Sequence, residues 1–513
     1  MSENVITYTE LPPNYFSVVN ENILLQEQNK DLQRNIELLK KALYGAKSEK
    51  LKSDEPHPNQ TKLFETILEE RPVLEGGIEI EVKPHTRKKR KRHEDKDGNS
   101  SHFPTELERK DIPLEPEGAG PCEACGKDKI EVSQKITEKL AIVPTQFYVE
   151  RHIRPVMGCK CGECKPISTA APTSPLPKSV LGVSFLAYIL VQKFGWHLPL
   201  YRQSKMLLEH NIDIHRDVLI NATLKLAEPL KLIVAQMTRE IRACELVHID
   251  ETPTMVRIKE GGKKRYDKQA YFWLILGGEQ VVYSYTGNRK HCNAAELLGE
   301  NFKGILVSDG YDAYLNYSKA NPEVSLALCW DHARRKFFEI KEHEPLAQEA
   351  LEHIKVFYKV ERDIKELELP PDKIPKYRKQ NALKALNKFK EWCEVVRDSS
   401  LPKDKLTQAC SYVINHWEGL SLYLEHGIVP ISNIIIEQQV RNLKLGVRNW
   451  LFAASEVGAD TVAVMNSLVC TCKMNNINML EYFTDILSRL DTDAAVKLTP
   501  LAWKREQESK KQQ

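Results

Sequence analysis

Residues 245–285 read ELVHIDETPTMVRIKEGGKKRYDKQAYFWLILGGEQVVYSY, and this stretch decides the expected fold. Apolar and polar side chains alternate from residue 246 to about 258, which is typical of a β-strand. Residues 271–276 and 280–285 are also strand-like and flank Gly277-Gly278, which predicts a β-hairpin. The fold therefore begins with three successive strands, and Asp250 lies on the first of them.

The sequence after these strands predicts a ribonuclease-H-like α/β fold. A helix is expected from about residue 294, followed by a short buried strand at 304–308 that ends in Asp309. Residues 325–329 form one more short strand and lead into a basic helix. A wholly helical insertion at about 340–423 precedes Pro430-Ile431-Ser432-Asn433, which is typical of a helix start. The helix that follows carries Glu437.

The region before these strands indicates several further modules. Leu25, Asn29, Leu32, Ile36, Leu39 and Leu43 follow a heptad pattern, which predicts a coiled-coil helix over residues 20–51. The alternative is an amphipathic helix that packs on the protein's own core. Residues 53–118 are rich in charge and proline and include the basic run at 87–92, which predicts a flexible linker able to hold phosphates. Residues 172–242 are expected to be helical. A turn at 211–213 makes two of these helices either a DNA-reading pair or plain packing elements, and packing is slightly favoured.

Two cysteine groups predict a zinc-ribbon-like module. Cys122 and Cys125 form one Cys-x-x-Cys pair, and Cys161 and Cys164 form another, with strand-like sequence at 139–153 between them. Four thiolates at this spacing can close a tetrahedral structural zinc site. Cys159 is a fifth sulfur that could replace Cys161.

Length and composition are those of a soluble protein with several domains. The 513 residues carry a net charge of +3, so bulk charge says little about partners. Residues 1–10 lack the charged-then-apolar pattern of a signal peptide, and no apolar run reaches 18 residues, so we expect a cytosolic protein without a membrane partner. The expected domains are a coiled-coil helix at 1–52, a basic linker at 53–118, a zinc module at 119–168, a helical domain at 169–244, a catalytic domain at 245–460 and a helical segment with a basic tail at 461–513.

Three carboxylates on the expected strands and the later helix are candidate metal ligands. The expected topology gathers Asp250, Asp309 and Glu437 at one edge of the sheet, where two Mg²⁺ ions could serve phosphodiester chemistry. Each residue also has an ordinary explanation. Asp309 before Gly310 is a common turn former, and Glu437 in a first helical turn suits the helix dipole. Spacing alone therefore indicates no more than a metal nuclease.

Several segments in the same order resemble transposases of the insertion-sequence 66 family, which belong to the DDE class. The resemblance begins with residues 43–51 (LYGAKSEKL) and the paired cysteines, and continues through 197–203 (HLPLYRQ). Residues 250–252 (DET) and 309–314 (DGYDAY) resemble the first two catalytic motifs, and 329–337 (CWDHARRKF) resembles the basic helix. The third motif is similar at Glu437, Arg441, Gly446, Asn449, Trp450, Leu451 and Phe452.

The resemblance implies metal-dependent cleavage at transposon ends and joining of the freed 3′-hydroxyl to target DNA. It implies Asp250, Asp309 and Glu437 as catalytic ligands of two Mg²⁺ or Mn²⁺ ions, a structural Zn²⁺, and small companion proteins of the same element. We expect a homodimer or larger assembly. The residues expected to contact DNA are Arg334, Arg335, Lys336, Arg441 and Arg448.

The third motif departs from the family pattern. Ser432 and Ile434 flank Asn433 where the family has Asp-Asn-Asn, Gln438 replaces an arginine, and Val447-Arg448 replaces Arg-Lys. Fewer charges beside the metal should weaken backbone contacts or the support of the site. Three hypotheses stay open: an active transposase, a zinc-containing DNA-binding protein derived from one that cuts poorly, and a general nuclease acting on branched DNA or RNA.

His332 and the aromatic residues Trp450 and Phe452 each have two possible roles. His332 could position DNA or water, or could be a structural histidine. Trp450 and Phe452 are expected in the core, with base stacking as the lesser alternative.

Overall fold

A computed structural model describes residues 93–94, 100–101, 146–157, 167–168, 174–260, 264–450 and 453–512. The chain forms two compact units, Met1–Thr145 and Gln146–Gln513. The predicted coiled-coil helix, the basic run at 87–92 and all five candidate zinc cysteines lie outside the described residues. In the first unit, β1 (His93–Glu94) pairs antiparallel with β2 (Ser100–Ser101).

A second short pair begins the other unit. β3 (Val156–Met157) pairs antiparallel with β4 (Ile167–Ser168). Residues 146–155 are neither helix nor strand. The strand-like interpretation of 139–153 is therefore wrong for the part that the structure describes, and the short strand comes a few residues later.

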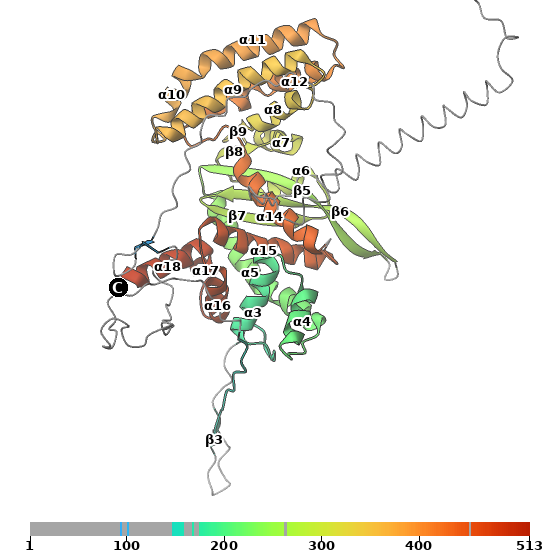
Figure 1. Cartoon of the computed structure of the whole chain (residues 1–513), viewed down its shortest axis with the longest axis vertical. Coiled ribbons are helices and arrows are strands. Elements are labelled where there is room, and N and C mark those ends of the chain that lie inside the picture. Colours follow the sequence, from blue (N-terminus) through green and yellow to red (C-terminus); the bar gives the residue numbers. More distant parts are fainter. Residues whose placement is uncertain are drawn as a thin grey trace, which may run out of the picture. The chain divides into compact units, whose positions relative to one another are not determined.

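A five-stranded mixed sheet forms the centre of the second unit (Figure 1). Its strands are β5 (Leu246–Glu260), β6 (Lys264–Gly277), β7 (Gln280–Thr286), β8 (Gly304–Ser308) and β9 (Val324–Leu328). Their spatial order is β7-β6-β5-β8-β9. The first three strands are antiparallel neighbours, and β5, β8 and β9 run parallel. All five strands agree with the elements predicted from the sequence, although β6 begins earlier.

The β6–β7 hairpin turns at Gly278 and Glu279, both of which have positive φ angles of 54° and 64°. Positive φ at both central residues is the conformation that a two-residue hairpin loop needs to match the twist of its strands. Glycine adopts it without strain, since it has no Cβ. This turn explains why the chain reverses direction at Gly278 and Glu279.

Helices cover both faces of the sheet. On one face Val247, Ile249 and Leu306 pack into a core shared with the long helix α5 (Arg216–Arg242). On the other face Phe272 and Leu274 pack against α14 (Ile434–Trp450). Because side chains alternate along a strand, the residues between the α5-facing ones, including Asp250, lie on the α14 side.

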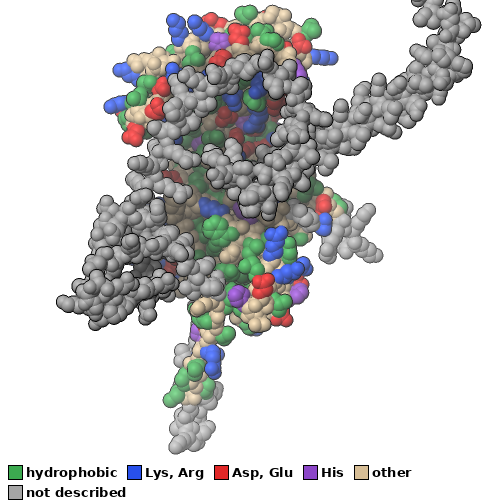
Figure 2. Space-filling model, in the orientation of Figure 1, with side chains coloured by type: hydrophobic (Ala, Val, Ile, Leu, Met, Phe, Trp, Pro, Cys, Tyr) green, Lys and Arg blue, Asp and Glu red, His purple; other side chains and the backbone are tan. Residues whose placement is uncertain are grey.

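The helical insertion lies between β9 and α14, as the sequence predicts. Its helices are α8 (Trp330–Phe338), α9 (Pro345–Glu366), α10 (Ile374–Asn381), α11 (Leu383–Ser399), α12 (Lys405–Asn415) and α13 (Trp417–Ser421), followed by the 3₁₀ turn η4 (Leu422–Leu424). They share a core around the buried Trp330 and Phe389 with residues of β8 and β9, including Val307 and Leu328. Acidic and basic side chains mix on the outer surface of the insertion (Figure 2).

The remaining helices lie on the opposite side of the sheet from the insertion (Figure 1). They are α3 (Val183–Leu190), the π-helix η3 (Val191–Gly195), α4 (Leu200–Glu209), α15 (Glu456–Met474), α16 (Met479–Arg489), α17 (Ala495–Leu498) and α18 (Pro500–Gln512). Short helices α6 (His291–Leu298) and α7 (Asp312–Ala320) connect the strands. In the described part of the chain, no helix is long and apolar enough to cross a membrane.

Helix α15 protects the edge strand β7. Thr471 Oγ1 accepts the Val281 N–H at 3.1 Å and donates to the Val281 carbonyl at 3.2 Å. Ser467 Oγ accepts the Tyr283 N–H at 2.9 Å. An edge strand with free backbone groups would be open to pairing with another chain. Helix α15 also packs on the sheet through Ala459, Ala463 and Cys470.

Candidate active site

Asp250 lies on β5, and Asp309 directly follows the neighbouring parallel strand β8. In the β5–β8 pair, His248 lies opposite Val307, and the same register continued by two residues places Asp250 opposite Asp309. Adjacent strands lie about 4.8 Å apart, and residues in register point to the same face. The two carboxylates are therefore neighbours at the carboxyl end of β8.

The surroundings of Asp250 oppose its negative charge. Burial raises the pKa of this carboxyl to about 8, and the nearby charges of Glu251, Asp309 and Glu437 add to the effect. One interaction favours the ionised form, because Asp250 Oδ1 accepts the Glu251 N–H at 2.9 Å. A half-buried carboxyl beside three others is a group that a cation would stabilise.

The backbone around Asp309 is held in a defined conformation. Its Oδ1 accepts the Tyr311 N–H at 2.9 Å, and its carbonyl accepts the Tyr412 hydroxyl at 2.8 Å. Gly310 has a φ of +88°, where a side chain would be strained, and an added Cβ would lie 3.0 Å from Tyr412 Oη. The turn after β8 therefore needs glycine, and the insertion helix α12 supports it through Tyr412.

Glu251 is a buried carboxylate for which the sequence pattern predicts no role. Its side chain is 3% exposed and forms an ion pair with Arg289, while Tyr314 donates a hydrogen bond to it. Burial raises the pKa of Glu251, and the hydrogen bonds from Tyr314 and Arg289 oppose that rise. The Arg289 guanidinium also lies 3.9 Å from the centre of the Tyr311 ring. This network links β5 to the turn that carries Asp309. Its only sequence signal is the position of Glu251 next to Asp250.

Asn433 fixes the start of α14 against β5. Its Oδ1 is 2.7 Å from Nδ1 of the buried His248, and its Nδ2 donates to the Ile249 carbonyl at 3.0 Å. Its own N–H donates to Cys329 Sγ at 3.2 Å. Glu437 lies one turn later, with its N–H bonded to the Asn433 carbonyl at 3.3 Å. Asn433 therefore joins three separate segments at the place where Glu437 begins.

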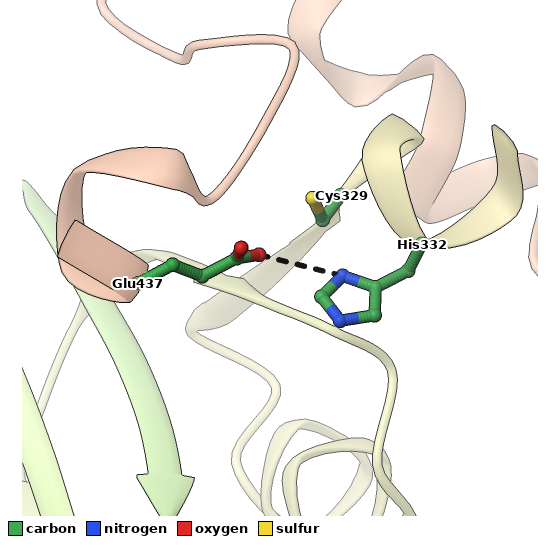
Figure 3. Close-up of side chains that lie close together, drawn as sticks. All are labelled: Cys329, His332 and Glu437. Atoms are coloured by element: carbon green, nitrogen blue, oxygen red, sulfur yellow. Dashed lines mark ion pairs between the residues drawn. The ribbon is translucent and has the colours of Figure 1, made fainter. Parts of the chain in front are cut away.

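Glu437 turns toward His332 (Figure 3). Glu437 Oε1 lies 3.8 Å from His332 Nδ1, and both atoms are buried without a hydrogen-bond partner. Ligand atoms of Cys329, His332 and Glu437 all lie within 4.8 Å of one another. Among the described residues, no other group of three or more His, Cys, Asp or Glu side chains meets that criterion, so Asp250, Asp309 and Glu437 are electrostatic neighbours with looser spacing.

The donor chemistry of the three acidic residues suits a hard divalent cation. Asp250, Asp309 and Glu437 offer carboxylate oxygens, which Mg²⁺ prefers together with water. The partnerless Glu437 Oε1 and the raised pKa of Asp250 both indicate unmet demand for positive charge. The loose spacing leaves room for bound water between ligands. The residues fit a magnesium site of the kind expected from the sequence.

The expected DNA-contacting residues lie on two helices. Arg334, Arg335 and Lys336 on α8 and Arg441 and Arg448 on α14 are all exposed. Lys336 also lies 4.5 Å from the centre of the Tyr412 ring, whose hydroxyl holds the Asp309 carbonyl. The α8 cations therefore begin two residues after His332, close to the acidic residues.

Trp450 is packed as the sequence predicts. Its ring lies 5.4 Å from that of Phe194, and the Lys193 ammonium lies 3.9 Å from its centre. An added Cβ on Gly446 would come within 2.2 Å of the Trp450 ring. The core interpretation of Trp450 is confirmed, while Phe452 lies outside the described residues.

Family models match three parts of the chain. The model described as "Transposase IS66 family" matches residues 178–461, which include Asp250, Asp309 and Glu437. A model for the zinc-finger binding domain of transposase IS66 matches residues 121–162, which include Cys122, Cys125, Cys159 and Cys161. A third, described as "Transposase C of IS166 homeodomain", matches residues 31–112.

Curated relatives match most of the chain. Uncharacterized protein y4jD of Sinorhizobium fredii is 27% identical over 93% of this chain and 95% of its own length. Uncharacterized protein y4hP of the same organism is 28% identical over 79% of this chain and 76% of its own. The similarity therefore extends through nearly the whole chain.

Proposed function

The chain belongs to the IS66 transposase family, and we propose that it is a DDE-type enzyme that cleaves transposon ends and joins the freed 3′-hydroxyl to target DNA. In this proposal Asp250, Asp309 and Glu437 hold two Mg²⁺ or Mn²⁺ ions. When bound, such ions activate the attacking oxygen and stabilise the leaving oxygen of the phosphodiester.

The single observation that carries the proposal is the register of β5 and β8. This pairing, continued by two residues, supports two neighbouring carboxylates on the face that α14 covers, with Glu437 of α14 as the third. Buried like charges persist in folded proteins when a cation or a proton balances them. The β7-β6-β5-β8-β9 order supports a ribonuclease-H-like core, since it has three antiparallel strands followed by two parallel ones.

The chain's own groups have separate tasks in this reaction. Glu251 with Arg289, and Tyr412 with the Asp309 carbonyl, keep the two strand carboxylates in position. Asn433 sets the start of α14 and thereby the reach of Glu437. Exposed cations on α8 and α14 would bind the DNA backbone, with an affinity that falls steeply as salt rises.

Several further properties belong to the same proposal. A structural Zn²⁺ would be held by Cys122, Cys125, Cys161 and Cys164 in the module at 119–168, with Cys159 as a possible substitute for Cys161. The heptad helix would join two chains on two DNA ends, with companion proteins of the same element taking part. A cytoplasmic location follows from action on bacterial DNA.

Cleavage of DNA fragments that carry the element's terminal repeats tests the proposal. Wild-type protein should cut at the repeat ends with Mg²⁺ and lose the activity when Asp250→Asn, Asp309→Asn or Glu437→Gln is introduced. The matched control is Asp372→Asn, an exposed acid in the helical insertion that should leave cleavage intact. Circular dichroism and thermal melting verify that each variant folds.

The outcomes separate the alternatives. Full cleavage by all three variants would refute the catalytic assignment. Salt-dependent binding to the repeats without cleavage in any metal would favour a catalytically impaired DNA-binding protein, as the substitutions at Ser432, Ile434 and Gln438 allow. Preference for branched DNA or RNA over the repeats would favour a general nuclease.

A further inference from the structure

Three side chains from two helix starts converge in one place (Figure 3). Cys329 directly precedes α8, His332 lies in the first turn of that helix, and Glu437 lies in the first turn of α14. Their sulfur, nitrogen and oxygen atoms all lie within 4.8 Å of one another. Cys329 is fully buried, whereas the side chains of His332 and Glu437 are 24% and 30% exposed. A small ligand could therefore reach the group from the His332 and Glu437 side.

The internal hydrogen bonding of this group is incomplete. His332 Nδ1 and Glu437 Oε1 are buried and face each other at 3.8 Å, which is too long for a hydrogen bond. Buried polar atoms without partners are uncommon and often mark a missing ion or water. Chance packing is not expected to leave two such atoms on facing side chains with a sulfur nearby.

We propose that Cys329, His332 and Glu437 bind one borderline-soft divalent ion of the Zn²⁺ type, at a site distinct from the Asp250–Asp309 pair. Zinc bonds of about 2.0–2.3 Å in tetrahedral geometry put ligand atoms about 3.4 Å apart, close to the observed nitrogen–oxygen separation. The Cys329 sulfur, which lies within 4.8 Å of both other ligand atoms, would have to move closer to them to form a bond of about 2.3 Å to the ion. Binding through sulfur releases the thiol proton to solvent. Mg²⁺ prefers oxygen and would not choose this donor set.

Cys329 also has a structural role that the test must separate from metal binding. Its sulfur accepts the Asn433 N–H at 3.2 Å. A serine at this position keeps a hydrogen-bond acceptor but removes the soft ligand. Cys329→Ser therefore preserves the packing contact while it weakens the metal site.

The proposed ion has a regulatory consequence, which rests on the proposed function. The first turn of α14 fixes the position of the Glu437 carboxylate. Glu437 therefore cannot be a full ligand of this site and of the Asp250–Asp309 site at the same time. Occupancy by a zinc-type ion would withdraw Glu437 from the magnesium site. Added Zn²⁺ should then inhibit Mg²⁺-dependent cleavage, and His332→Gln should relieve that inhibition.

Co²⁺ titration of the full chain, supplied with only the one equivalent of zinc that the cysteine module needs, tests the site without relying on cleavage. Co²⁺ bound to a thiolate gives a near-ultraviolet charge-transfer band, whose growth reports the affinity. The band should be equally intense in wild type, in Asp250→Asn and in the buried-thiol control Cys410→Ser. It should be weaker in Cys329→Ser. His332→Gln and Glu437→Gln should weaken Co²⁺ binding by about 10-fold to 100-fold or more.

Two results would overturn the site. Identical Co²⁺ spectra for wild type and Cys329→Ser would exclude sulfur ligation, and loss of the band in Asp250→Asn would place the ion at the other carboxylates. If Cys329→Ser does not fold, unchanged Co²⁺ affinity in both His332→Gln and Glu437→Gln would overturn the proposal equally. Failure of DNA cleavage would leave these spectra unaffected, so the two proposals fail separately.

Discussion

Replacing Asp250 by asparagine should stabilise the magnesium-free protein at neutral pH. The pKa of Asp250 rises from 3.8 to about 8, chiefly through burial and the neighbouring Glu251 and Asp309 charges. Between these values the folded chain retains a proton that the unfolded chain releases, so the contribution of Asp250 to stability is full below pH 3.8 and is lost as pH rises toward 8. Each pH unit between these two values lowers the free energy of unfolding by about 1.4 kcal/mol.

At pH 7 this cost is roughly 4 kcal/mol as an upper bound, and partial solvent access lowers it to about 2–4 kcal/mol. The asparagine side chain keeps the shape of the carboxyl and cannot ionise. Asp250→Asn should therefore raise the melting temperature by several degrees at pH 7, and the gain should shrink toward zero as pH falls to 4. Saturating Mg²⁺ should stabilise the wild type and leave the variant unchanged.

Thermal melting from pH 4 to 8, with the structural zinc present and no other divalent ion, measures both effects. Asp213→Asn, an exposed loop acid, is the matched control and should change stability by less than about 0.5 kcal/mol. Destabilisation of Asp250→Asn at pH 7, or a gain that does not vary with pH, would show that the Asp250 carboxylate is not destabilised by its surroundings.

Two further substitutions test the supports of the site, and a third tests a buried ion pair within the helical insertion. Gly310→Ala should cost about 1–3 kcal/mol in chemical denaturation and slow cleavage, because it strains a φ of +88° and crowds Tyr412; unchanged stability would contradict the glycine requirement. Asn433→Ala should cost about 1–3 kcal/mol and reduce cleavage, because it leaves the buried His248 without its partner; full activity would show that Glu437 is positioned independently. Arg378→Met should cost about 3–5 kcal/mol by the same denaturation assay, because it strands the half-buried Glu361 and three backbone carbonyls; a stabler variant would mean that this ion pair opposes folding.

The sequence predicted the sheet well because its signals are local. Alternation through 246–258, the glycine pair at 277–278 and the strand ending at Asp309 each depend on neighbouring residues, and all agree with β5 to β8. The helical insertion and the start of α14 were predicted for the same reason, from helical pattern and from the Pro430–Asn433 helix start.

The contacts that complete the site depend on distant segments and carry no local signal. The Glu251 ion pair joins residues 38 positions apart, and the His248–Asn433 hydrogen bond joins residues 185 apart. Strand alternation places Glu251 on the sheet face opposite Asp250. It does not indicate that an arginine balances the negative charge of Glu251. The approach of Glu437 to His332 likewise follows from how α14 packs beside α8, which sequence periodicity cannot specify.

Locating Mn²⁺ by anomalous diffraction in crystals of the full chain would test the central claim most directly. We expect a peak between the Asp250 and Asp309 carboxylates, within coordination distance of both. A pair of carboxylates free of Mn²⁺ at saturating concentration, with the metal bound elsewhere, would contradict the assignment of this site as the catalytic centre.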